Sequence, residues 1–334
     1  MIRVATIGSG VIVDRMIQAI EATENMMVEA VYSRTEEKAD AFAKKHNVSR
    51  SFANMDNMLA DESINTIYVA SPNSFHYEQS KKALLAGKHV ICEKPFCSTL
   101  AQAEELFALA QEKGVFIFEA ITNIHTPNFH HIEANLKRCG EIKLVQCNFS
   151  QFSSKYLDYK AHKQRNVFDL SFDGGALTDI NVYNLHFVVG LFGMPTSIEY
   201  IANVGYNGID TSGIAILKYP GMMAVCTGAK DCSSPNCAYI QGDEGTIRMD
   251  QASIGVCSHV DFIPPKGDAI GKKKDKSAFE ELGIEQEFHM NYECRDFTKA
   301  ILNNDTASYE KWKEQTLRVV QLLEECKRQR ACQE

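Results

Sequence analysis

The sequence predicts an α/β protein in two parts, a parallel sheet with crossover helices followed by a mostly antiparallel sheet. In the first 120 residues, short apolar runs alternate with helical patterns of about 10–15 residues. After about residue 128, alternating strands are instead separated by glycine and asparagine turns. The 334 residues also exceed the roughly 250–300 at which a single core stops growing. We therefore expect two domains, residues 1–120 and 121–334.

The N-terminal part predicts five strands joined by helices. The strands are expected at residues 2–7, 28–32, 64–70, 89–92 and 115–118, with helices at 11–22, after Ser33, at 74–86 and from Thr99 to Gly114. Ser33 with Glu36 and Thr99 with Gln102 have the spacing of capping boxes. Strands that alternate with helices form crossover units, whose ligands bind beyond the carboxyl ends of the strands.

The C-terminal part predicts an α+β domain with a large, mostly antiparallel sheet. Strands are expected within residues 142–152, 197–203, 213–219, 222–229 and 238–249, with helices at 176–191, 288–303 and 309–329. A charged run at 271–276 is expected to be a surface loop. Both faces of strands 142–152 and 238–249 carry apolar groups, so one face packs on helices and the other needs a cover. We predict a homodimer or homotetramer through this sheet.

Composition excludes several functional classes. The chain is 45% hydrophobic and 23% charged, and its charge sum is 35 − 43 = −8, which makes it a poor candidate for nucleic-acid binding. No segment approaches the roughly 18 consecutive apolar residues of a membrane span, and the first residues do not resemble a signal peptide. None of the eleven cysteines has the paired spacing of a zinc site. We expect free thiols, no metal and a cytoplasmic protein with no membrane partner.

A glycine-rich turn follows the first strand. It reads Gly8-Ser9-Gly10-Val11-Ile12-Val13, with Val13 in place of the usual third glycine. Gly8 permits the tight turn, and Gly10 lets the backbone approach a pyrophosphate at the helix N-terminus. Because the motif joins the first strand to the first helix, it predicts a Rossmann dinucleotide-binding domain. The alternative is a purely structural strand-to-helix turn.

The end of the second predicted strand bears on the choice of cofactor. An Asp or Glu at this position would bind the ribose 2′-hydroxyl of NAD. This strand instead ends in Tyr32-Ser33-Arg34, where Arg34 can pair with a 2′-phosphate and Ser33 can donate to it. NADP is therefore preferred over NAD. An ordinary surface arginine is the alternative interpretation.

Two further patterns predict polar chemistry. The fourth strand of the N-terminal part runs into Glu93-Lys94-Pro95, and the proline restricts Lys94 to an extended conformation. In the predicted helix after Gly174-Gly175, Asp179, Tyr183 and His186 lie at i, i+4 and i+7 on one face. The ammonium of the lysine could polarise a substrate oxygen, and the three polar side chains on one helix face indicate a polar pocket. A solvated lysine and a buried hydrogen-bonded set without chemistry are the respective alternatives.

These motifs together make the chain resemble the Gfo/Idh/MocA family of glucose-fructose oxidoreductase, inositol dehydrogenase and the rhizopine catabolism dehydrogenase. The resemblance covers nearly the whole chain. It rests on the motifs Gly8–Gly10, Ser71-Pro72-Asn73 with His76, Glu93-Lys94-Pro95, Glu119-Ala120 with Pro127, Gly174–Asp179 and Gly242-Asp243-Glu244-Gly245. Such proteins join an N-terminal Rossmann domain to a C-terminal α+β domain whose open sheet commonly forms the oligomer interface.

The resemblance also implies roles for individual residues. The cofactor-binding set would be Gly8, Ser9, Gly10, Val11, Ile12, Ser33, Arg34, Ser71, Pro72, Asn73, His76, Glu93 and Lys94. The catalytic lysine and aspartate of the family fall on Lys94 and Asp179. Tyr183 stands where inositol dehydrogenases have histidine, as in the glucose-fructose oxidoreductase and dimeric dihydrodiol dehydrogenase branches. The implied substrate is a sugar, polyol or diol.

This chain departs from the family pattern at three positions. Asn181 stands where glycine is frequent, Ile124 where many members have arginine, and Thr126 where histidine usually precedes the proline. The last two changes weaken the transfer of substrate contacts from better-known members.

The expected activity is a dehydrogenase or reductase acting on CH–OH groups. Tyr183 would move the proton, the ammonium of Lys94 would stabilise its phenolate, Asp179 would orient either group, and His186 would be the reserve acid. Two alternatives stay open. One is a non-catalytic regulatory protein of the same fold that senses a dinucleotide, and the other is an enzyme that holds its cofactor tightly for internal redox with overall hydrolysis.

Overall fold

The computed structural model describes residues 1–265 and 279–332, which form two compact units. Unit 1 comprises Met1–Ile121, Ser171–Asp173 and Phe288–Glu324, and unit 2 comprises Thr122–Leu170, Gly174–Glu287 and Glu325–Glu334. The charged loop expected at residues 271–276 lies outside the described residues. A division into domains after residue 120 stays a prediction.

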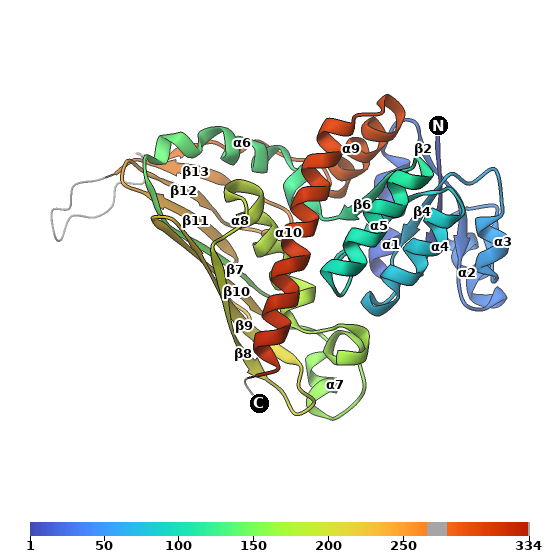
Figure 1. Ribbon diagram of the computed structural model, residues 1–334, viewed down its shortest axis with the longest axis horizontal. Helices are drawn as coiled ribbons and strands as arrows, with labels where there is room; N and C mark the ends of the chain where they lie inside the picture. The colour runs from blue at the N-terminus through green and yellow to red at the C-terminus, as the bar shows by residue number, and fades with distance from the viewer. Residues whose placement is uncertain (266–278, 333–334) are drawn as a thin grey trace. The chain divides into compact units, whose positions relative to one another are not determined.

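Unit 1 is built on a six-stranded, all-parallel sheet of order β3-β2-β1-β4-β5-β6 (Figure 1). The strands are β1 (Ile2–Ile7), β2 (Met26–Tyr32), β3 (Ser51–Phe52), β4 (Thr66–Val69), β5 (His89–Glu93) and β6 (Ile117–Ala120). This confirms the predicted parallel sheet. The two-residue strand β3 was not predicted, because it is too short to show a periodicity.

Unit 1 contains the four helices predicted in the N-terminal part, a short helix at Met55–Leu59 that was not predicted, and two helices that were predicted within the C-terminal part. They are α1 (Val11–Glu21), α2 (Glu36–Lys45), α3 (Met55–Leu59), α4 (His76–Leu85), α5 (Leu100–Lys113), α9 (Met290–Asn303) and the first part of α10 (Thr306–Arg330). The capping box predicted at Ser33 is wrong, because Thr35 accepts the N–H of Lys38 instead. Thr99 does cap α5, which ends at the left-handed Gly114.

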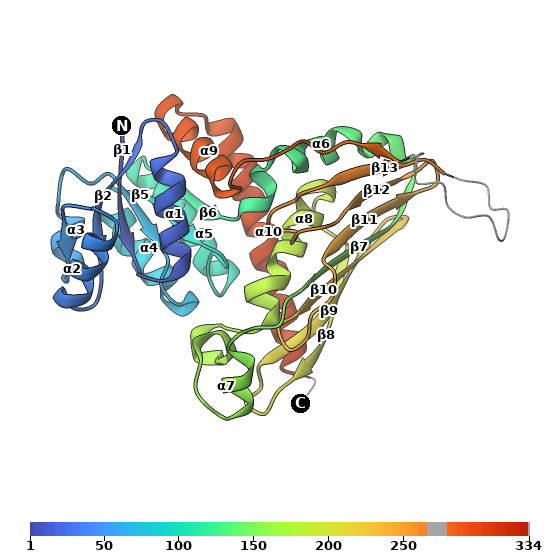
Figure 2. The same ribbon diagram turned by 180° about the vertical axis from the view of Figure 1, so that it is seen from behind.

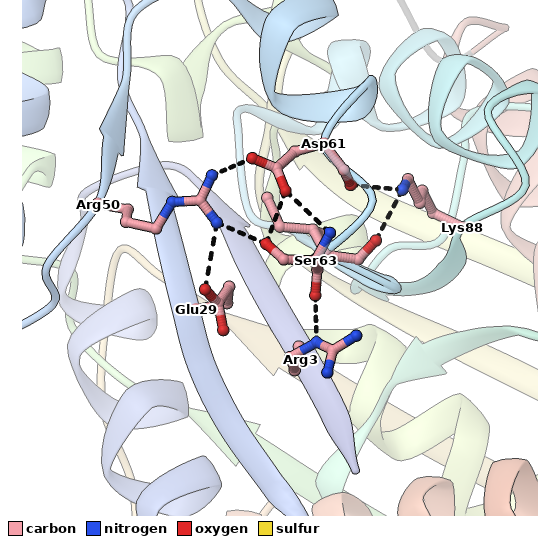
Figure 3. Close-up of polar contacts among 7 residues, drawn as sticks. Arg3, Glu29, Arg50, Asp61, Ser63 and Lys88 are labelled. Atoms are coloured by element: carbon pink, nitrogen blue, oxygen red, sulfur yellow. Dashed lines mark hydrogen bonds and ion pairs between the residues drawn. The ribbon is translucent and has the colours of Figure 1, made fainter.

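A charged cluster ties the loop before β4 to neighbouring strands (Figure 3). Arg50 donates to Glu29 at 3.2 Å and also to Asp61 and Ser63, and its hydrogen bond lowers the pKa of Asp61 to about 2. Lys88 donates to the carbonyl oxygens of Asp61 and Ile64 at 2.8 and 2.7 Å. Residues 61–65 and Lys88 precede β4 and β5, so the cluster lies toward the amino ends of these strands. Ligands of parallel sheets bind at the opposite edge, so the cluster is structural.

Unit 2 is built on an eight-stranded sheet of order β14-β13-β12-β11-β7-β10-β9-β8 (Figure 2). The strands are β7 (Ile142–Ser150), β8 (Ser197–Val204), β9 (Asp210–Tyr219), β10 (Met222–Ala229), β11 (Cys237–Gly242), β12 (Thr246–Met249), β13 (Val260–Ile263) and β14 (Glu280–Glu281). Among the strands that the structure describes in this sheet, only β7 and β10 pair in parallel, so the predicted mostly antiparallel sheet is confirmed.

Three helices of unit 2 contribute to the arrangement of its polar residues. They are α6 (Pro127–Asn135), α7 (Tyr156–Lys160) and α8 (Val182–Phe192). Helix α8 packs on β7 and β10, and in both views no described helix covers the opposite face of these strands (Figures 1 and 2). All eleven cysteines are free. Within residues 1–265 and 279–332, no helix has the length and apolar character needed to traverse a bilayer.

Candidate active site

The glycine-rich turn has the geometry that a dinucleotide requires. Gly8 has a φ of 120°, and a Cβ added to it would lie 2.5 Å from the carbonyl oxygen of Ala70. A Cβ on Gly10 would meet no atom within 4 Å, so the space above this residue is open. Gly10 begins α1 without a side-chain cap. The first N–H groups of α1 are thus placed to bind a phosphate, and the residues fit a dinucleotide.

The absence of the third glycine is accommodated by the core. Val13 is fully buried, and its Cγ2 lies 3.4 Å from the position of a Cβ on Gly8. The valine side chain therefore fills the gap between helix and strand that a glycine would leave. Ser9 and Val11 are exposed on the turn, and Ile12 is half-buried.

The carboxyl end of β2 presents an unpaired arginine. Arg34 is exposed, and no residue within 1–265 and 279–332 forms an ion pair with it. Ser33 is buried, and its N–H donates to the carbonyl oxygen of Phe52 at 3.1 Å. The guanidinium is thus available for a negatively charged ligand at the ligand-binding edge of the sheet.

His76 links the loop after β4 to the loop after β5. It is buried, and its ring nitrogens each lie 2.9 Å from a backbone oxygen, Nε2 from Ser71 and Nδ1 from Pro95. Pro72 and Asn73 are half-buried, and the side-chain amide of Asn73 donates to the carbonyl oxygen of Asp173 at 2.9 Å. His76 therefore holds two loops together, one of which carries Lys94.

Buried carboxyl groups surround the base of the lysine turn. Glu93 is 6% exposed and accepts the hydroxyl of Tyr68 at 2.5 Å. Burial raises the pKa of Glu93 to about 7, although the Tyr68 hydrogen bond and the charge of Lys94 oppose the shift. Glu119 accepts the N–H of Phe96 at 3.0 Å and the hydroxyl of Thr316 at 2.9 Å. Glu293 is also fully buried, and its pKa is raised by burial. Lys94 itself is half-buried.

In unit 2, the helix that carries the other candidates begins differently from the prediction. Its first turn, Leu177–Asn181, is a π-helix, and the α-helix starts only at Val182. The prediction of a continuous α-helix from Ala176 is therefore wrong for this turn. The wider turn also alters the angle between Asp179 and the residues that follow, so the three polar groups do not form a regular stripe.

A buried carboxylate starts this π turn. Asp210 accepts the N–H of Leu177 at 2.6 Å, the hydroxyl of Tyr200 at 2.9 Å and the guanidinium of Arg330 at 2.6 Å. Gly175, with a φ of 114°, passes so close that a Cβ would lie 2.3 Å from the same carboxylate. The carboxylate thus fixes where the helix begins. In this way it also fixes the position of Asp179 along the helix axis.

The three predicted groups on this helix have different surroundings. Asp179 is 32% exposed and accepts a hydrogen bond from the ammonium of Lys230. Tyr183 is half-buried, with its ring 5.7 Å from that of Phe149, and Asn123 donates to its carbonyl oxygen at 2.9 Å. His186 is fully buried. Asp179 and Tyr183 are therefore the accessible members of the predicted set.

Sequence reasoning missed two contributors to this part of the site. Lys230 directly follows β10, and a charged residue at a strand end was the available signal. Gly255 lies beside the phenol, since a Cβ on it would be 3.2 Å from Cε1 of Tyr183. Thr122 donates to the carbonyl oxygen of Gly255 at 2.7 Å and holds this loop in place. No local pattern connects Gly255 to Tyr183, which is 72 positions earlier in the chain.

The parallel sheet, the open glycine turn and the uncapped helix define the class of a dinucleotide-binding protein. Residues 2–121 match the Gfo/Idh/MocA model described as an oxidoreductase family with an NAD-binding Rossmann fold, and residues 135–248 match the C-terminal domain model of the same family. The chain belongs to the Gfo/Idh/MocA oxidoreductase family.

Relatives and solved structures agree with this assignment. The chain is 32% identical to scyllo-inositol 2-dehydrogenase (NADP(+)) of Bacillus subtilis, over 98% of this chain and 97% of the relative. It is 30% identical to trans-1,2-dihydrobenzene-1,2-diol dehydrogenase of Xenopus tropicalis, over 70% and 69% of the two chains. The fold matches the 3-ketoreductase KijD10 of Actinomadura kijaniata with a TM-score of 0.82 at 24% identity, over 96% and 95% of the chains.

Proposed function

We propose that this protein is an NADP-dependent dehydrogenase or reductase that acts on a CH–OH group of a polyol, diol or sugar. The observation that carries the proposal is the full-length similarity to an NADP-dependent inositol dehydrogenase, together with the exposed Arg34 at the end of β2. The dihydrodiol dehydrogenases support the same substrate chemistry, a pair of neighbouring oxygens on a ring.

We assign the site residues the roles that the family resemblance implies. When bound, the nicotinamide cofactor supplies or accepts the hydride. The α1 N-terminus and Gly10 receive the pyrophosphate, and Arg34 with Ser33 receives the 2′-phosphate. Tyr183 moves the proton to or from the substrate oxygen, Lys94 stabilises the phenolate, and Asp179 orients the reacting groups. His76 supports cofactor binding by holding together the loops that carry Ser71 and Lys94.

The proposal also covers assembly and location. The uncovered sheet face carries apolar cross-strand pairs, Ile201 with Ile214, Ile216 with Val225, and Leu144 with Met223. Four of these six side chains are at least 37% exposed. A second copy of the chain would bury them, so we expect a homodimer or homotetramer through this face, in the cytoplasm. A monomer by light scattering at micromolar concentration would refute the assembly.

The activity is tested by absorbance at 340 nm. The purified protein is given NADP⁺ with a panel of inositols, dihydrodiols and sugars, and NADPH with the corresponding ketones. An absorbance change with at least one class supports the proposal. Retained NADPH binding without any turnover favours the regulatory alternative. Release of nucleotide on denaturing the purified protein, with hydrolysis products and no exchange of cofactor, favours internal redox.

A further inference from the structure

We infer that Lys230 is a positioning residue, which holds the carboxylate of Asp179 in place to accept a hydrogen bond from a substrate hydroxyl. The inference rests on the proposed function and deepens it. The ammonium of Lys230 donates to Oδ2 of Asp179. The lysine side chain is 9% exposed and the aspartate side chain 32% exposed, so the carboxylate is the more accessible partner of the pair.

The backbone of Lys230 is fixed on both sides. Its N–H donates to the carbonyl oxygen of Thr211 at 2.9 Å, and its carbonyl oxygen accepts the N–H of Ser153 at 2.8 Å. The neighbouring Asp231 accepts the hydroxyls of Thr211 and Ser212 at 2.7 and 2.9 Å. The segment that carries Lys230 is therefore hydrogen-bonded to β9 and to the loop after β7.

The position of Asp179 is also fixed by hydrogen bonds of the surrounding backbone. Its N–H donates to the carbonyl oxygen of Gly175 at 3.1 Å, and the π turn that carries it begins on the carboxylate of Asp210. Each partner of the ion pair is thus held by its own part of unit 2. Their hydrogen bond therefore joins two segments that are each held by backbone hydrogen bonds, and it orients the carboxylate of Asp179.

The charge arrangement defines the ligand chemistry. A buried ammonium is costly unless it is paired, so Lys230 favours the ionised form of Asp179. An ionised carboxylate only accepts hydrogen bonds, and it accepts them most strongly when it is charged. The exposed part of the Asp179 carboxylate can therefore accept a hydrogen bond from a donor group of the substrate. A hydroxyl beside the reacting carbon, as polyols and diols provide, has the required chemistry, whereas a substrate with only ether or carboxylate oxygens there does not.

The test compares Lys230→Met with Lys137→Met, a substitution of an exposed lysine in the same unit. With a polyol found active, we expect Lys230→Met to raise KM by roughly 10–100-fold, the range of a lost charge-assisted hydrogen bond, with the larger effect on KM than on kcat. The acidic limb of the kcat/KM profile should move to higher pH. Lys137→Met and the affinity for NADPH should stay at the wild-type level.

Two results would overturn the role of Lys230. One is a folded Lys230→Met protein with the wild-type KM and pH profile, and the other is an equal loss with Lys137→Met. If Lys230→Met does not fold, Lys230→Ala is measured instead, because alanine also cannot donate to Asp179; an unchanged KM there overturns the inference as well. If the wild-type protein is inactive on every substrate of the panel, the proposed function itself is contradicted. That result is obtained before any variant is made, so it is distinguished from a failure of the inference about Lys230.

Discussion

The guanidinium of Arg330, in the last turn of α10, donates to the fully buried carboxylate of Asp210 at 2.6 Å. The same carboxylate accepts the N–H of Leu177, at the start of the helix that carries Asp179 and Tyr183. The chain terminus and the candidate catalytic helix are therefore joined through a single buried side chain.

Arg330→Met should destabilise the protein by about 3–5 kcal/mol, because it leaves a buried carboxylate without its cation. Arg328→Met is the matched control. Arg328 lies two residues before Arg330 in the same helix and forms an exposed ion pair with Glu325. Exposed pairs contribute about 0–1 kcal/mol. Chemical denaturation of the three proteins measures both effects. Equal stabilities of the two variants would show that the buried pair does not stabilise unit 2.

The two glycines of the turn should respond differently to alanine. Gly8→Ala places a Cβ against the carbonyl oxygen of Ala70 at a positive φ, which should cost about 1–3 kcal/mol of stability. Gly10→Ala meets open space and should leave the stability unchanged. It should nevertheless weaken NADPH binding by roughly 10–100-fold, because the methyl group would keep a pyrophosphate from the N–H groups. Thermal unfolding and fluorescence titration separate the two, and unchanged NADPH affinity in Gly10→Ala would contradict the placement of the pyrophosphate.

Cofactor choice should depend on Arg34. Wild-type protein is expected to bind NADPH more tightly than NADH, and Arg34→Ala should remove the preference by weakening NADPH roughly 10–100-fold. The affinity for NADH is the internal control, since that cofactor has no 2′-phosphate. Equal affinities for both nucleotides in the wild-type protein would show that Arg34 does not select the cofactor.

Tyr183→Phe and Lys94→Ala should each slow turnover by roughly 10²–10⁴-fold, the usual range for general acid–base groups. We propose that the two residues act as a unit, so the double variant should be little slower than either single one. NADPH affinity should survive Tyr183→Phe. Single-turnover hydride transfer with an active substrate is the measurement. Full rate in Tyr183→Phe with loss in His186→Ala would assign the proton to the fully buried His186 instead.

The free energy of unfolding should decrease as pH rises, because Glu93 loses its proton over this range. Its folded pKa is raised from 4.5 to about 7, so the folded state binds this proton more tightly than the unfolded state. The contribution is therefore greatest below pH 4.5 and is lost as pH rises toward about 7, a loss of up to about 3 kcal/mol. Glu93→Gln should lack this loss. The difference in unfolding free energy between wild type and variant, followed from pH 4.5 to 7.5, isolates it from other groups, and the exposed Glu112→Gln is the control. A pH-independent difference would contradict the shift.

Local patterns were sufficient to predict most elements and to select candidate residues for the site. The alternation of apolar runs with helices predicted the parallel sheet, and the cap at Thr99 and the left-handed Gly114 occur where their residue types indicated. The glycine turn, Arg34 and Lys94 all follow strands of a parallel sheet. Their placement at one edge therefore follows from strand direction, which sequence periodicity already indicates.

Contacts between distant segments could not be predicted in the same way. Lys230 contacts Asp179 across 51 positions, and Arg330 contacts Asp210 across 120. The π turn at Leu177–Asn181 depends on that buried carboxylate rather than on helix propensity, and the parallel pairing of β7 with β10 joins strands separated by two others. Thus the sequence by itself determined the class of fold, the cofactor turn and the residue types of the site. Tertiary structure decided which charges pair and how the candidate catalytic helix begins, because packing and charge burial act between residues that no local pattern links.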